Sequence, residues 1–130
     1  MNTKFYVPFE TAKMLKKAGY PQAGSDMYYN PNGELKTQVE LIAGYKEDYP
    51  IMITYYYAAP TYHEVLYWLE WKGIYVSAFL SIGETYIEDI YKILWKSFID
   101  VPNNEEQSSG VYSTREEALN NGIIKALKML

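Results

Sequence analysis

The stretch AAPTYHEVLYWLEWKGIYVSAFLSI, residues 58–82, carries the signals that start a helix, end it and begin a strand. Pro60 favours an extended conformation for the residue before it. Thr61 and Glu64 have the spacing of a capping box, in which each side chain accepts a hydrogen bond from a free N–H at the helix start. We therefore expect a central helix that begins at Thr61.

The end of this central helix is marked as clearly as its start. Lys72 suits the negative end of the helix dipole, and Gly73 can take the left-handed conformation that commonly terminates helices. The segment 74–82 that follows is rich in β-branched and aromatic residues and is too short for a second core helix. It is predicted to be a strand.

An earlier helix is predicted over residues 7–19, with Pro8 in its first turn and Gly19 as the residue that ends it. A narrow apolar face predicts that this helix lies at the surface of the domain. That face consists of Ala12, Leu15 and Ala18. Three lysines are interpreted as a solvated face, with an anion site as the less favoured alternative: Lys13, Lys16 and Lys17.

The segment between these two helices contains one clear turn and one ambiguous region. Residues 27–35 surround the turn signal Asn30-Pro31-Asn32-Gly33 and predict a small hairpin. Residues 37–50 fit either a short helix or a strand, and both alternatives stay open. The run IMITYYY, residues 51–57, favours β structure and is predicted to be extended.

Residues 85–94 fit both the helical and the strand period. Thr85 and Glu88 could form a capping box, but apolar and polar residues also alternate. We predict a strand, because the strand at 74–82 needs a partner and a short connection through Gly83 makes a hairpin the nearest one. Residues 95–101 are expected to extend the same sheet.

The C-terminal region combines a polar loop and a closing helix. Residues 102–110, PNNEEQSSG, contain no apolar side chain to bury and predict a flexible loop. Ser113 and Glu116 form a further capping box, and Gly122 inside the helix indicates close packing on a neighbour. The apolar face of this helix comprises Leu119, Ile123, Ala126, Leu127 and Leu130.

Together these elements predict one α+β domain over residues 1–130, with a small, mainly antiparallel sheet packed against two to three helices. A chain of 130 residues is long enough for one core and too short for two. Hydrophobic residues make up 48% of it, as in ordinary globular proteins, and 15 tyrosines make the expected core aromatic.

Composition disfavours several kinds of partner. A net charge of −4 opposes binding to the nucleic-acid backbone, which depends on clustered Lys and Arg. The absence of cysteine excludes disulfides and thiolate sites. No signal-peptide core and no run approaching 18 apolar residues is present, so we expect a cytoplasmic protein without a membrane partner.

No pattern in the chain indicates catalysis. His63 is the only histidine, which rules out a histidine-rich metal site, and it is interpreted as a surface residue. The acidic groups around Glu84 and Glu105 lack the spacing of a cation loop and are interpreted as solvated charges. Nucleotide-binding, zinc-protease and serine-hydrolase motifs are absent. We therefore expect no catalytic residue, no metal and no cofactor.

Three blocks of sequence carry a resemblance to known proteins: VPFETAKMLKKAGY at the N-terminus, APTYHEVLYWLEWKGIYV in the centre and YSTREEALNNGIIKALKML at the C-terminus. They resemble a group of small uncharacterised proteins of Bacteroides-type gut bacteria, whose genes are often carried by prophages or other mobile elements. The resemblance implies an accessory role in such an element and transfers no functional residue.

The central helix offers the one candidate binding surface. At 100° per residue its aliphatic side chains cluster on one side, whereas Tyr67 and Trp71 point nearly opposite and Trp68 lies on the flank. Two interpretations remain open: the helix at 7–19 or the run at 51–57 covers these rings, or they contact a protein partner or a second copy. In the second case three further tyrosines are expected to contribute: Tyr55, Tyr56 and Tyr57.

The expected function is that of a small non-enzymatic binding or accessory protein. A self-associating structural component, such as a minor phage part, is the first alternative. An enzyme that uses carboxylate and tyrosine chemistry is the second.

Overall fold

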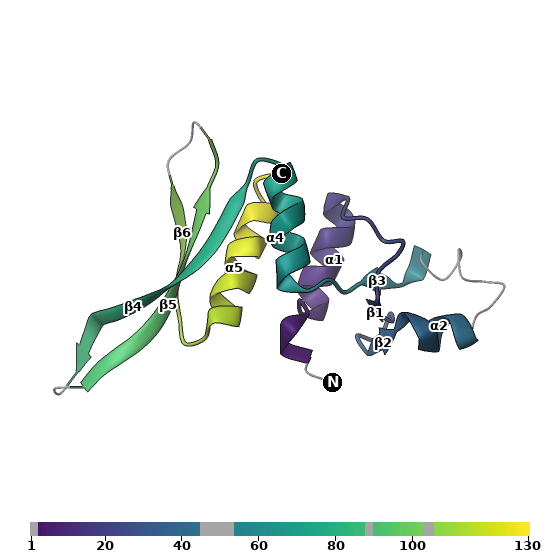
Figure 1. Ribbon diagram of the computed structural model, residues 1–130, viewed down its shortest axis with the longest axis horizontal. Coiled ribbons are helices and arrows are strands. Elements are labelled where there is room, and N and C mark those ends of the chain that lie inside the picture. The colour runs from purple at the N-terminus through teal and green to yellow at the C-terminus, as the bar shows by residue number, and fades with distance from the viewer. Residues whose placement is uncertain (1–2, 45–53, 88–89, 103–105) are drawn as a thin grey trace. The chain divides into compact units, whose positions relative to one another are not determined.

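The computed structural model describes residues 3–44, 54–87, 90–102 and 106–130. The fold is α+β, as predicted, and the chain forms two compact units, Met1–His63 and Glu64–Leu130, here called the N-terminal and C-terminal units. Within the described residues each unit contains its own three-stranded antiparallel sheet (Figure 1). The expectation of one sheet is therefore wrong, while that of a single domain stays a prediction.

The N-terminal unit begins with a short 3-10 helix, η1 (Thr3–Phe5), followed by α1 (Phe9–Ala18). Gly19 ends α1 in the left-handed conformation, with φ of 98°. The N–H groups of Gly19 and Tyr20 donate to the carbonyls of Lys16 and Leu15, which completes the expected helix end. The side chains that α1 buries are Thr11, Ala12 and Leu15, whereas Ala18 is half-buried.

The predicted hairpin is confirmed as β1 (Met27–Tyr29) and β2 (Leu35–Thr37). The side-chain oxygen of Asn30 accepts hydrogen bonds from the N–H groups of Asn32 and Glu34, and Gly33 supplies the positive φ of 84° that the turn needs. β3 (Tyr57–Ala58) pairs with the other side of β1, so the strand order is β2-β1-β3.

The ambiguous region is a helix where it is described: α2 spans Gln38–Gly44. It begins where the hydroxyl of Thr37 accepts a hydrogen bond from the N–H of Glu40, at 3.1 Å. Residues 45–50, and 51–53 of the run predicted to be extended, lie outside the described residues. The prediction that residues 51–57 are extended is wrong for Thr54 and Tyr55, which are helical. It is correct for Tyr57.

The central helix is α4 (Tyr62–Trp71), and it ends as expected. Gly73 has a φ of 78°, its N–H donates to the carbonyl of Glu70, and the N–H of Ile74 donates to the carbonyl of Leu69. These two bonds form the Schellman motif, which satisfies the last carbonyls of the helix. The chain then enters the second sheet directly.

This second sheet consists of β4 (Tyr75–Ile87), β5 (Ile90–Asp100) and β6 (Gln107–Tyr112), in that order. The prediction of a strand at residues 85–94 is thus confirmed at the described positions. Residues 95–100 extend the same sheet, as expected, and β5 ends at Asp100. The expected turn at Gly83 is wrong: Gly83 lies inside β4, and the chain reverses between the paired residues Ile87 and Ile90. The register shifts between Ile82 and Tyr86, so this glycine accompanies an irregularity within a longer strand.

The predicted loop at 102–110 is also partly wrong, because residues 107–110 belong to β6. This strand pairs with β5 at the edge of the sheet, and edge pairing needs backbone N–H and C=O groups rather than apolar side chains. Residues 103–105 lie outside the described residues. The polar residues 107–110 therefore indicate a loop although they form part of a strand.

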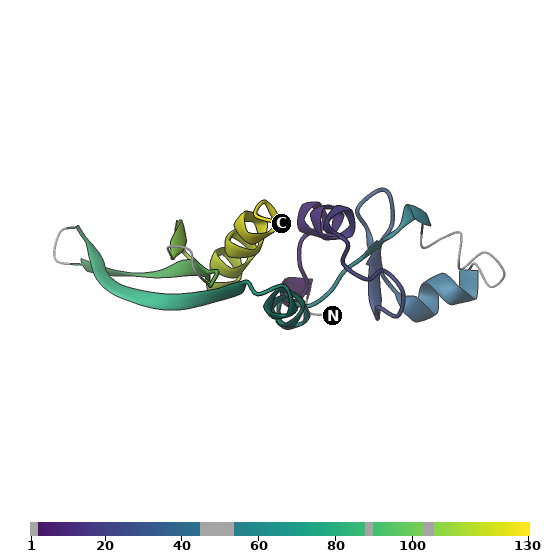
Figure 2. The same ribbon diagram turned by 90° about the horizontal axis from the view of Figure 1, so that it is seen from above.

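The last helix, α5 (Arg115–Leu127), covers one face of the second sheet (Figure 2). Its cap is Thr114 rather than Ser113: the Thr114 hydroxyl accepts the N–H of Glu117, whose carboxylate accepts a hydrogen bond from the Ser113 hydroxyl. Leu130 lies beyond the helix and is exposed, contrary to expectation. The other expected face residues are buried: Leu119, Ile123, Ala126 and Leu127.

Gly122 confirms the expected close approach of helix and sheet. A Cβ atom at this position would lie 2.7 Å from Cγ1 of Val76 and 3.3 Å from the side chain of Ser97. Contacts below 3.0 Å leave no room for a methyl group unless the neighbour moves. The absence of a side chain therefore sets the distance between α5 and the strands β4 and β5.

Candidate functional site

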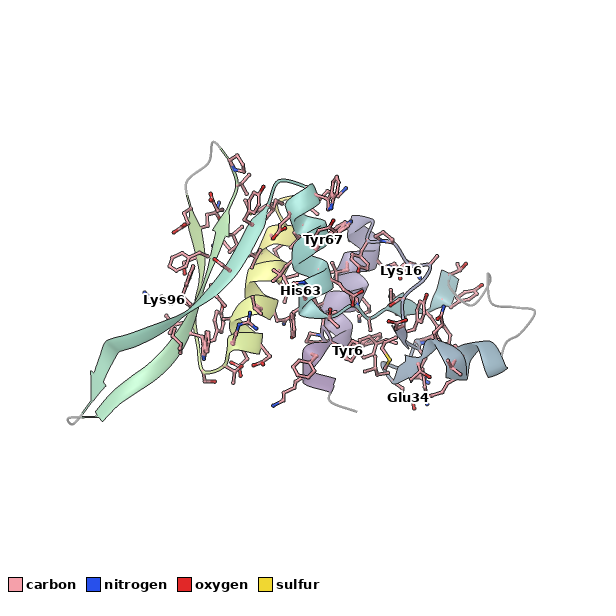
Figure 3. The ribbon with its side chains drawn as sticks, in the orientation of Figure 1. Tyr6, Lys16, Glu34, His63, Tyr67 and Lys96 are labelled. Carbon is pink, nitrogen blue, oxygen red and sulfur yellow. The ribbon has the colours of Figure 1, made fainter. Side chains whose placement is uncertain are left out.

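An exposed aromatic pair lies on α4. Tyr67 and Trp71 are 61% and 76% exposed, one helical turn apart, and their rings meet edge to face with centroids 6.3 Å apart. Glu70 joins them in lining a shallow, open hollow. We call these three residues the α4 aromatic patch; Figure 3 labels Tyr67.

The rest of α4 follows the predicted distribution of side chains. Val65 and Leu69 are fully buried on the side opposite the patch. Trp68, on the flank, is half-buried, and the ammonium group of Lys72 lies 5.4 Å from the centre of its ring. This cation–π contact ties Trp68 to the end of the helix and leaves the patch as the exposed aromatic surface of α4.

The three tyrosines expected to contribute to the surface have different environments in the N-terminal unit. Tyr55 is 63% exposed. Tyr56 is half-buried against a core cluster of Tyr28, Leu41 and Ala58. Tyr57, also half-buried, meets the ring of Phe9 edge to face at 5.5 Å. Tyr56 and Tyr57 therefore support the fold of this unit, and Tyr55 alone of the three presents most of its surface to solvent.

Among the lysines of α1, Lys16 is engaged in packing more than the sequence indicates. Lys16 donates to the carbonyls of Thr54 and Tyr56, at 2.6 and 2.8 Å, and its ammonium group lies 4.9 Å from the Tyr57 ring. Burial lowers the pKa of Lys16 below its ordinary value. The interpretation of Lys16 as part of a solvated face is therefore wrong, because its donors are directed at carbonyls of its own chain.

The groups considered for catalysis do not form a site where the structure describes them. His63 and Glu106 are exposed, whereas Glu88, Asp89 and Glu105 lie outside the described residues. Among the described residues no group of three or more His, Asp or Glu side chains lies close enough together to hold a metal ion. The helices described for this chain also lack the length and hydrophobicity of a transmembrane segment.

Glu70 is the member of the patch that the sequence argument missed. It precedes Trp71 and follows Tyr67 by three residues, a spacing that places side chains on neighbouring positions of a helix surface. The helical period alone therefore places Glu70 beside the two rings, although it is not aromatic.

No protein-family description, curated protein or solved structure matches this chain.

Proposed function

We propose that this chain is a small non-enzymatic protein-binding or accessory protein of a prophage or other mobile element, acting in the cytoplasm of a Bacteroides-type bacterium. The resemblance of three sequence blocks supports the origin. The α4 aromatic patch supports the binding role, because it presents two large rings to solvent on the side of the helix away from its buried residues.

The exposure of Trp71 is the observation that carries this proposal. Trp and Tyr are the residue types most enriched among those that dominate binding energy in protein interfaces. A Trp ring that is 76% exposed gains hydrophobic free energy only when another surface covers it. The edge-to-face contact with Tyr67 favours one orientation of the ring, which lowers the entropy lost on binding.

The chemistry of the patch indicates the kind of partner. Glu70 places a carboxylate beside the two rings, and the whole chain carries a net charge of −4. A protein surface with an apolar anchor next to a Lys or Arg side chain complements this arrangement. The same charge disfavours nucleic acid, whose phosphates would be repelled.

The test compares proteins captured from extracts of the native host by wild-type chain and by two variants. Trp71→Ala should lose the partner, because it removes most of the apolar area of the patch, and Glu70→Lys should weaken capture by reversing the charge. Val39→Ala is the matched control, since Val39 lies on α2 and is also 76% exposed. Capture that is equal for the wild type, the two patch variants and the control would show that the patch is not a binding surface.

A self-associating structural component is the second candidate function. The observation that favours it lies on a different surface, the face of the second sheet that α5 leaves uncovered.

A further inference from the structure

The second sheet has one covered and one open face. Val76 and Ser97 face α5, since both lie against Gly122. Side chains alternate between the faces along each strand, so the neighbours of these two residues project from the opposite face. Figure 3 shows Lys96, the neighbour of Ser97, on the side of the sheet away from α5.

The open face is apolar and aromatic. Tyr75, Phe79 and Val111 are exposed by 48%, 54% and 46% respectively. The ring of Phe98 is half-buried and lies 5.7 Å from that of Phe79, which confirms that the two share a face. Large apolar side chains from all three strands therefore lie on this face, and exposed apolar side chains gathered on one face mark an interaction site.

Charged residues are placed symmetrically on this face. Along β5 the same face carries Lys96, Phe98 and Asp100 in succession, a cation and an anion at equal distances from a central ring. The pairing of strands adds an aromatic residue beside each charge: Phe79 lies opposite Lys96, and Tyr75 lies opposite Asp100. The pattern is complementary to itself when it is turned end for end about Phe98.

We propose that the open face packs against the same face of a second copy of this chain. A two-fold axis that runs across the strands at Phe98 places Lys96 over Asp100 of the partner subunit. The same axis places Phe79 over Tyr75 of the partner subunit. Because the interface is isologous, each of these contacts occurs twice, and the two sheets form a sandwich with side chains interdigitated between layers about 10 Å apart.

Charge complementarity is the reason for choosing a second copy over another partner. A foreign surface would need its own anion and cation at the spacing of Lys96 and Asp100, whereas a second copy carries them already. The α4 aromatic patch takes no part in this contact, so the proposal is independent of the protein-binding function proposed for that patch and bears on the second candidate function, self-association.

The test measures the mass of the full chain in solution by sedimentation velocity over a range of concentrations. The wild type should approach twice its monomer mass of 15.1 kDa. Lys96→Asp places two pairs of like charges in the interface and should raise the dissociation constant at least about tenfold, as should Asp100→Lys. The double variant, which exchanges the two charges, should restore dimerisation.

Two controls separate this contact from other effects. Lys17→Asp makes the same change in net charge at an exposed position of α1 and should leave the dimer intact, as should Trp71→Ala. If Lys96→Asp fails to fold, Phe79→Ser, which removes a half-exposed ring, should weaken the dimer instead. A wild type that stays monomeric, or a dimer that the charge changes do not affect, would overturn the proposal and leave this face to another partner or to the N-terminal unit.

Discussion

Lys16 connects α1 to a segment about 40 residues later in the chain. Its ammonium group binds two carbonyls, of Thr54 and Tyr56, and lies over the ring of Tyr57. These contacts hold the chain where it enters β3. Thr54 and Tyr55 are helical, which their β-favouring sequence does not indicate.

Replacing Lys16 by Met should therefore destabilise the protein although the volume and the aliphatic stem are largely kept. We expect a loss of about 1–2 kcal/mol in the free energy of unfolding, since hydrogen bonds from a charged donor are lost while the cost of burying the charge is recovered. Urea denaturation measures this loss. The matched control is Lys17→Met, because Lys17 is exposed and should change stability by less than about 0.5 kcal/mol. Equal effects of the two variants would contradict a specific role for Lys16.

Tyr29 makes a second such link, because its hydroxyl donates to the carbonyl of Val7 at 2.8 Å. Burial raises the pKa of Tyr29 above its ordinary value of 10.0, so the folded protein holds the phenolic proton more tightly than the unfolded chain does. The stability that Tyr29 contributes is therefore complete below pH 10 and is lost as the pH rises through the raised pKa.

Comparing wild type with Tyr29→Phe isolates this contribution from that of the other tyrosines. At pH 7 the variant should be less stable by about 1 kcal/mol, because the hydrogen bond is lost and the shape is retained. Above pH 10 the difference should shrink, since ionisation of Tyr29 penalises the wild type alone. Unfolding free energies at both pH values check this, and a difference that is independent of pH would show that Tyr29 does not titrate as proposed.

At the scale of single residues, the sequence predicts helix ends and turns, whose signals are local. It does not predict contacts between residues that are distant in the chain. Gly19, Gly33 and Gly73 end helices or complete a turn as predicted, because the signal and the structure lie within a few residues. Lys16 was misinterpreted because both of its carbonyl partners are more than 35 residues away. The sequence shows that a lysine is present but not which carbonyls the fold brings to it.

At the scale of elements, a strand can depend on its neighbour more than on its own composition. Residues 107–110 of β6 are polar and indicate a loop, yet β5 supplies the backbone partners that make them part of a strand. The turn at Gly83 was misplaced for the same reason: pairing with β5 continues past this glycine as far as Ile87. Hydrophobic periodicity indicates which side chains are buried. Because an edge strand or an irregular strand also depends on backbone pairing with its neighbour, this periodicity does not locate it.

The packing of α5 on its sheet depends on the missing side chain at Gly122. Gly122→Ala should gain about 1 kcal/mol in helix propensity and lose about 1–3 kcal/mol by forcing the methyl group against Val76, a stiff β-branched side chain. We expect a net loss of stability, measured by thermal unfolding. Adding Val76→Ala should make room for the methyl group, so that the same Gly122→Ala change becomes neutral or stabilising in that background. A Gly122→Ala variant that is more stable than wild type would contradict the close packing.

At the scale of the whole molecule, the α+β class could be predicted because α1, α4, α5 and most of the described strands have local signals. The candidate surfaces were predictable to different degrees. Tyr67 and Trp71 follow from the helical period alone, whereas the open sheet face depends on which residues of β4, β5 and β6 lie opposite one another. Register is a property of pairing between strands, so Phe98 could not be placed beside Phe79 from the sequence.

The size of the two units predicts that residues 1–130 unfold as one domain. Each has about half of 130 residues, a length at which a hydrophobic core alone gives marginal stability, so we expect a single cooperative transition. The three tryptophans, Trp68, Trp71 and Trp95, all belong to the C-terminal unit, so their fluorescence reports on that unit alone. Lys16→Met, which changes the N-terminal unit, should lower the midpoint of the fluorescence transition as much as the midpoint measured by circular dichroism. If fluorescence keeps the wild-type midpoint while circular dichroism shifts or divides into two steps, the units unfold separately and the chain has two domains.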